Sequence, residues 1–143
     1  MAILDSTFNP AIRMALHSSL TTEALPDAMI ALNIYLGAAE AEILRRDPDA
    51  ASRTGTELIV VQNAAVLMTA ALLAPAVELM QSEYIPGGGY RYQRPEVNWK
   101  ERAALLRQRA ESELTTLLSP SSPSLSARPT LFAVASRTFR SYP

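Results

Sequence analysis

The chain has 143 residues, a formal net charge of −1 at pH 7, no cysteine, and 48% hydrophobic residues. This length and apolar fraction are enough for one buried core, so we expect a single folded domain plus appendages. The absence of cysteine excludes a disulfide framework, a thiolate metal site and a cysteine nucleophile.

The amino-terminal stretch MAILDSTFNPAIRM carries an acid at Asp5 and lacks a long apolar run after a basic start. It therefore does not resemble a secretory signal, and we expect a soluble protein made in the cytoplasm.

The first helix is predicted over residues 10–19, because Asn9 can cap it and Pro10 is tolerated at the first helical position. The only histidine, His17, has no acid at ligand spacing, which favours a surface or interface imidazole over a metal ligand or base.

A second helix is predicted over residues 27–46, DAMIALNIYLGAAEAEILRR, as one continuous amphipathic element. It begins with an acid and ends with two arginines, as the helix dipole prefers, and Asp47-Pro48 stops it. Its apolar residues recur at spacings of three and four. They are Met29, Leu32, Leu36, Ala39 and Ile43.

The spacing of the acids in this region does not indicate a catalytic or calcium-binding site. Glu40 and Glu42 are two residues apart on a helix and face different directions, so a solvated face is favoured over a carboxylate pair. Asp47 and Asp49 could suggest a calcium loop, but Pro48 intervenes and the further ligands with a bidentate glutamate are missing. We interpret them as a turn.

The third helix, about residues 51–82, is the longest and most apolar and is predicted to be the central element. Apolar residues occupy one stripe and much of the opposite face between residues 64 and 77, so contacts on several sides are expected. The stripe consists of Leu58, Val61, Ala65, Met68, Leu72, Pro75 and Leu79. Pro75 should kink the helix, because proline lacks a backbone donor and clashes with the preceding turn.

A membrane span is the rival interpretation of this helix, because about 20 apolar residues cross a bilayer. The uninterrupted apolar run is short and alanine-rich, and Gln62, Asn63 and Glu78 flank it. It also lacks the basic cluster that sets the orientation of a spanning segment. We therefore favour a core helix and expect no membrane partner.

The stretch EYIPGGGYRYQRPEVNW, residues 83–99, is predicted to be a connecting loop that binds a protein partner. Its three successive glycines lack the preceding strand and the following lysine of a phosphate loop, so nucleotide binding is not favoured. The aromatic and arginine side chains are types enriched at protein interfaces. They are Tyr84, Tyr90, Arg91, Tyr92 and Arg94. For Tyr84, packing back onto the protein's own helices is an equally good interpretation.

The fourth helix begins near Pro95-Glu96 and runs through VNWKERAALLRQRAESELTTLL to residue 118, with one apolar face. That face consists of Trp99, Ala103, Leu106, Ala110, Leu114 and Leu117. The sequence thus predicts an all-α fold, a small helical bundle of three long helices and a short amino-terminal one, occupying residues 1–118.

Residues 119–143 are predicted to form an extended carboxy-terminal docking tail. The segment SPSSPSLSARP is rich in serine and proline and cannot form a packed element, whereas TLFAVASRTFRSYP regains apolar and aromatic residues. The chain has no acid after Glu113. Three scattered arginines are too few for a nucleic-acid patch, so acidic protein surface is the expected counterpart. The candidate docking residues are Arg128, Leu131, Phe132, Val134, Arg137, Phe139, Arg140 and Tyr142.

Three stretches in succession carry a family resemblance: PDAMIALNIYLGAAEAEILRRDPD, then VELMQSEYIPGGGYRY, then NWKERAALLRQRAESEL. Over about residues 25–118 the chain resembles the head-to-tail connector, or adaptor, proteins of tailed bacteriophages. The triple glycine and the long Ser/Pro tail depart from that resemblance.

The resemblance implies a structural protein of the virion neck that forms a homo-oligomeric ring, commonly of twelve copies. Its partners would be the portal protein, a stopper or tail-completion protein, and itself, with DNA passing through the ring. The loop and the tail would make these contacts. The alternative is a helical scaffolding or regulatory module that binds a cellular protein without forming a ring. An enzyme is ranked below both, because the sequence shows no nucleophile with a base, metal cluster or cofactor loop. No cofactor or metal is expected.

Overall fold

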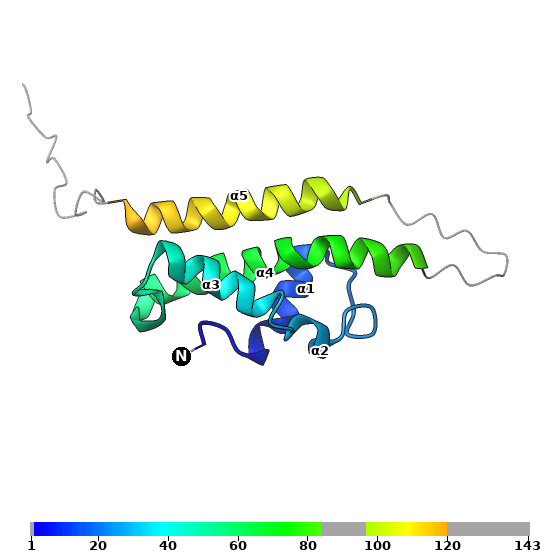
Figure 1. Ribbon diagram of the computed structural model, residues 1–143, viewed down its shortest axis with the longest axis horizontal. Coiled ribbons are helices and arrows are strands. Elements are labelled where there is room, and N and C mark those ends of the chain that lie inside the picture. Colours follow the sequence, from blue (N-terminus) through cyan, green and yellow to red (C-terminus); the bar gives the residue numbers. More distant parts are fainter. Residues whose placement is uncertain (1, 84–96, 120–143) are drawn as a thin grey trace, which may run out of the picture.

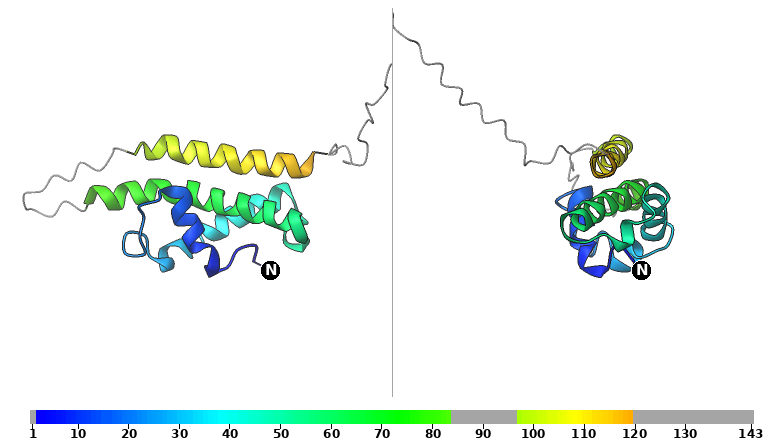
Figure 2. Two further views of the ribbon diagram at one scale, coloured as in Figure 1. Left: turned by 180° about the vertical axis from the view of Figure 1, so that it is seen from behind. Right: turned by 90° about the vertical axis from the view of Figure 1, so that its left-hand side faces the viewer.

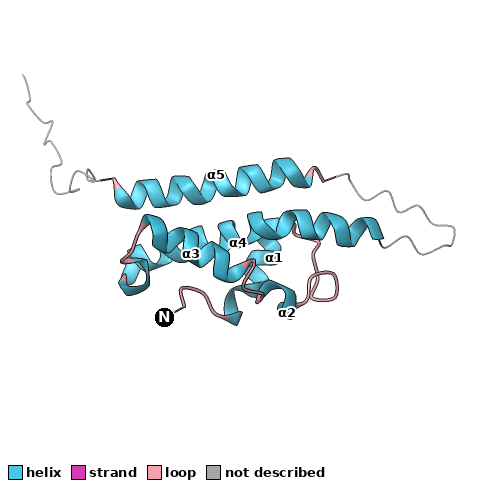
Figure 3. Cartoon of the chain, in the orientation of Figure 1, coloured by secondary structure: helices cyan, strands magenta, loops and turns pink. Residues whose placement is uncertain are grey.

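The computed structural model describes residues 2–83 and 97–119, and all regular elements within these ranges are helices (Figures 1 and 3). The all-α class is therefore confirmed. The α-helices are α1 (Asn9–Leu16), α2 (Asp27–Ile30), α3 (Leu36–Arg46), α4 (Gly55–Glu83) and α5 (Trp99–Leu118). Two single-turn 3-10 helices, η1 (Ser6–Phe8) and η2 (Ala50–Ser52), precede α1 and α4.

Helix α4 is the central element, as predicted. α5 runs antiparallel along one side of it, while α1 and α3 lie toward the other side (Figures 1 and 2). Buried residues on α4 point in every direction, because neighbours surround most of the helix. They include Val61, Ala64, Ala65, Met68, Thr69, Leu73 and Val77.

One stretch of α4, Gly55–Met80, is long and apolar enough to cross a membrane by length and composition. Its most apolar part is 56% buried against the protein itself. A core helix has both properties, so this burial agrees with the interpretation favoured above. The helix continues through Pro75, which lies on an exposed side and does not end it.

The prediction of one helix over residues 27–46 was wrong, because residues 31–35 form turns that separate α2 from α3. At about 100° per residue, Ile30 and Ala39 would lie on opposite sides of a continuous helix. Both side chains are fully buried in the structure. The break lets each face the core, and it leaves Leu32 46% and Ile34 66% exposed.

Helix α5 confirms the predicted one-sided helix. Trp99, Leu106, Ala110 and Leu114 are buried on a single face. Asn98 caps the helix by accepting a hydrogen bond from the backbone N–H of Glu101, so α5 begins a few residues later than expected.

Candidate protein-docking groove

The thirteen partner-binding residues predicted from the sequence all lie outside the described residues. They are Tyr84, Tyr90, Arg91, Tyr92, Arg94, Arg128, Leu131, Phe132, Val134, Arg137, Phe139, Arg140 and Tyr142. Their roles stay predictions. The described helices offer a different candidate site, which the sequence did not indicate.

This site exists because α5 is anchored beside α1 and is joined to α3 at one end. Arg102 on α5 donates from Nη2 to the carbonyl oxygen of Ala15 at 2.7 Å and from Nε to that of Leu16 at 3.1 Å. These are two carbonyls of the last turn of α1, which would otherwise lack helical partners. On the other side, Arg46 Nη2 on α3 lies 3.0 Å from Glu111 Oε1 on α5.

Two adjoining hollows, of about 300 and 460 Å³, lie along α5 above α4, and α3 forms the far wall of the smaller one. They share Leu72, Arg107 and Glu111. We call the two together the α3–α5 groove. Its lining residues are Ala38, Glu42, Arg46, Met68, Ala71, Leu72, Pro75, Lys100, Ala103, Ala104, Arg107, Gln108 and Glu111.

The floor of the groove is apolar and comes from α4. Met68 is buried, Leu72 is half-buried and Pro75 is exposed. Alanines on the walls, among them Ala38 and Ala104, leave room above this floor because their side chains are short.

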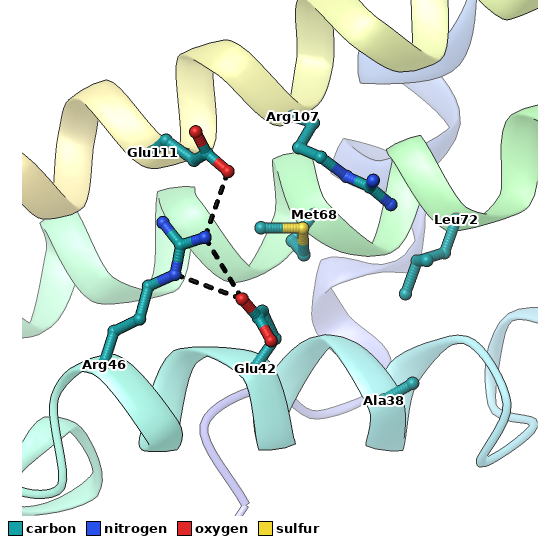
Figure 4. A pocket seen from close by; sticks show the side chains of 7 residues that line it. All are labelled: Ala38, Glu42, Arg46, Met68, Leu72, Arg107 and Glu111. Atoms are coloured by element: carbon teal, nitrogen blue, oxygen red, sulfur yellow. Dashed lines mark hydrogen bonds and ion pairs between the residues drawn. The ribbon is translucent and has the colours of Figure 1, made fainter.

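The rim of the groove is charged, and part of that charge is paired internally. Arg46 lies 3.1 Å from Glu42 Oε1 as well as 3.0 Å from Glu111 Oε1 (Figure 4). The hydrogen bond from Arg45 is the main cause that lowers the pKa of Glu42 below its ordinary value, and Arg46 adds to it. Glu42 is therefore a carboxylate at neutral pH and is engaged by two arginines.

Two cations at the groove form no ion pair with any described residue. They are Arg107, which lines both hollows, and Lys100, which lines the larger one. Figure 4 shows the guanidinium of Arg107 over the floor between Met68 and Leu72. The groove thus combines an apolar floor with positive charge that a carboxylate-bearing partner could neutralise.

Glu40 and Asp47 have structural roles. Glu40 was predicted to lie on a solvated face, and that prediction was wrong: its Oε1 accepts hydrogen bonds from the backbone N–H groups of Ile3 at 2.8 Å and Leu4 at 2.9 Å. Both residues are buried at the amino terminus, so their N–H groups need an acceptor within the protein, and the carboxylate provides it.

The predicted turn at Asp47 is confirmed, and Asp47 is in addition buried. Its Oδ2 lies 2.5 Å from Nε of Arg53, which also pairs with Glu57 at 2.9 Å. The two carboxylates raise the pKa of Arg53.

His17 follows α1, and its Nδ1 lies 2.7 Å from Ser19 Oγ. Within residues 2–83 and 97–119, no three histidine, aspartate or glutamate side chains gather as a metal site would require.

No protein-family model matches the chain, and no curated protein or solved structure matches it. The resemblance to phage adaptors therefore stays a prediction.

Proposed function

We propose that this protein is a non-enzymatic structural adaptor of a tailed-phage neck, forming a homo-oligomeric ring between the portal and a stopper or tail-completion protein. In this proposal residues 1–118 are a small helical bundle centred on α4, and residues 119–143 are the extended docking tail. The resemblance over residues 25–118 suggests the family. The observation that carries a docking role is the α3–α5 groove.

The groove has the form that proteins use to bind a helix. At its smaller hollow, α3 and α5 supply the walls and α4 supplies the floor, so an added amphipathic helix could pack on α4 beside α5. Its apolar floor supplies hydrophobic contact, and the charges of Arg107 and Lys100 select a partner with carboxylates beside its apolar face.

The tail supports binding to a second, different partner. It contains arginines and aromatic residues and no acid, whereas the rest of the chain contains all 14 acids. Such a segment suits an acidic protein surface.

Deleting residues 119–143 tests the adaptor proposal. We expect the truncated chain to keep its helical circular dichroism and its unfolding midpoint, because the contacts that join α4 to α5, α1 and α3 come from residues before position 119. We expect it to lose binding to the portal protein encoded in the same genome, measured by pull-down and by electron microscopy of the complex. An unchanged portal affinity would refute the tail assignment.

A scaffolding or regulatory module is the second candidate, since a helix-binding groove also serves a protein that acts as a single copy. Native mass measurement of the full chain with portal separates the two functions. A ring of copies bound to one portal supports the adaptor. Absence of any portal complex, together with one-to-one capture of a cellular protein, supports the module.

A further inference from the structure

The carboxy-terminal end of α4 reaches past the start of α5 in both side views of the molecule (Figures 1 and 2). This end, residues 76–83 with the sequence AVELMQSE, contains two acids and no base. Glu78 is exposed and forms no ion pair with a described residue. Leu79 beside it is 66% exposed. We call residues 76–83 the α4 end.

The α4 end is a helix and the α3–α5 groove is a surface that could hold one. The two also carry opposite charges beside their apolar side chains. The α4 end is a helix that presents an apolar side chain beside a carboxylate. The groove presents an apolar floor beside two cations, Arg107 and Lys100, that have no ion-pair partner among the described residues. A rim ion pair of this kind orients a contact whose affinity comes from the apolar burial.

The α4 end cannot enter the groove of its own subunit. Leu79 follows Leu72 by seven residues on the same continuous helix, which places it about 10 Å farther along the axis. A helix cannot fold back onto its own preceding turns. The occupant that fits is therefore the α4 end of a second copy.

We propose that the α4 end of one copy docks in the α3–α5 groove of another, with Leu79 on Leu72 and with Glu78 beside Arg107. The inference rests on the proposed function, because it supplies the subunit contact that a ring needs. The two surfaces are different patches of one chain, so the contact is heterologous and each copy can bind the next.

The absence of native cysteine allows this contact to be trapped with engineered cysteines. One chain carries Leu79→Cys and a second, differently tagged chain carries Ala38→Cys on the groove wall. Because each chain holds a single cysteine, every mixed disulfide joins two copies. Ala38 shares a hollow with Met68 and Leu72, so docking brings it close to residue 79. A disulfide requires Cα atoms about 4.4–6.8 Å apart.

The matched control replaces the Leu79→Cys chain with a Met14→Cys chain, since Met14 is 64% exposed on α1, away from the groove. We expect the mixed disulfide from Leu79→Cys to form at least about tenfold faster than that from Met14→Cys, because docking holds the reacting pair together. Equal rates for the two pairs, or no mixed disulfide from Leu79→Cys, would overturn the inference.

Charge reversal provides a second, independent measurement in chains that keep Leu79. Glu78→Arg and Arg107→Glu should each lower the self-association constant, measured by sedimentation, by about tenfold, because each creates a like-charge contact. An equimolar mixture of the two variants should regain association, because the new arginine on the α4 end of one variant meets the new glutamate in the groove of the other. Failure of the mixture to recover would also overturn the inference.

The two proposals fail separately. If portal binding is lost on tail deletion but the disulfide between positions 79 and 38 does not form, the groove contact is wrong and the adaptor role stands. If the disulfide forms but no ring assembles on the portal, the groove contact stands and the adaptor role is wrong.

Discussion

At the scale of single residues, the polar groups inside this small core each have a specific partner. Among the described residues, no buried side-chain nitrogen or oxygen lacks a hydrogen bond. Arg13 is only 7% exposed, donates from Nε to the carbonyl oxygen of Leu25 at 2.8 Å, and pairs with Asp27. Such groups hold the irregular segments in place, because an unpaired buried polar group is costly.

Glu40 offers the first test at this scale. Glu40→Ala should lower the free energy of unfolding by about 1–3 kcal/mol, because the buried N–H groups of Ile3 and Leu4 lose their acceptor. Glu40→Gln is the matched control, since its amide oxygen can accept from the same donors, and it should cost less. Urea unfolding measures both. An alanine variant as stable as wild type would show that these hydrogen bonds contribute nothing.

The Arg13–Asp27 pair predicts a pH dependence of stability. The hydrogen bond from Arg13 is the main cause that holds the pKa of Asp27 below its ordinary 3.8. A carboxyl with a lowered pKa in the folded state contributes stability above its unfolded pKa, and that contribution is lost as the pH falls through the folded value.

The stability difference between wild type and Asp27→Asn should therefore be constant above about pH 5. It should shrink below pH 3.8, as the carboxyl of the unfolded and then of the folded chain becomes protonated. Thermal unfolding midpoints measured across the acid range, with a neutral reference, test this expectation. Profiles that stay parallel across the whole range would contradict it.

At the scale of elements, the close antiparallel contact between α4 and α5 depends on small residues. Ala110 on α5 is fully buried against Met68 of α4 and Ala39 of α3. Three helices thus approach at one place, and a short side chain there allows it.

Ala110→Leu should therefore destabilise the protein by about 1–3 kcal/mol, because extra methylene groups in a packed site force neighbours apart. Ala104→Leu, on the exposed wall of the groove on the same helix, is the matched control. It should leave stability within about 0.5 kcal/mol of wild type. Chemical denaturation of the two variants measures the difference. Equal stability would show that α5 does not pack tightly at Ala110.

The element type of α4 and α5 was predictable from the sequence. α4 and α5 followed from period and length, because a sustained repeat requires a helix to bury it. The break after Ile30 was not predictable, because the three- and four-residue spacing continues across it while Ile30 and Ala39 need opposite sides of a straight helix.

The candidate site depended on contacts that are remote in sequence. The groove is open because Arg102 joins α5 to α1. Its hydrogen bonds reach Leu16 and Ala15, which precede it by 86 and 87 positions in the sequence. Local pattern carries no information about such a pair. Met68, Leu72 and Pro75 were correctly placed on one apolar stripe, but the arrangement of the helices decides that Met68 is buried while Leu72 and Pro75 stay partly or fully exposed. The predicted loop and tail sites lie outside the described residues and stay predictions.

At the scale of the whole molecule, the surroundings of α4 decide whether the chain is expected in water or in lipid. It is the one described helix that is long and apolar enough to span a membrane, and its most apolar part is 56% buried within the protein. The apolar surface of α4 can contact either lipid or the helices α1, α3 and α5. Where it packs against those helices, it cannot contact lipid as well.

We expect the intact chain to stay in the supernatant after cell lysis and high-speed centrifugation without detergent, because its own helices already cover α4. Leu106→Asp should move the protein to the pellet, since a charge at this buried α5 position would separate α5 from α4 and uncover the apolar helix. Leu105→Asp, one residue away and 39% exposed, is the matched control and should remain in the supernatant. If wild type itself required detergent and stayed with membranes after alkaline washing, α4 would face lipid, and both the groove and the adaptor role would have to be abandoned.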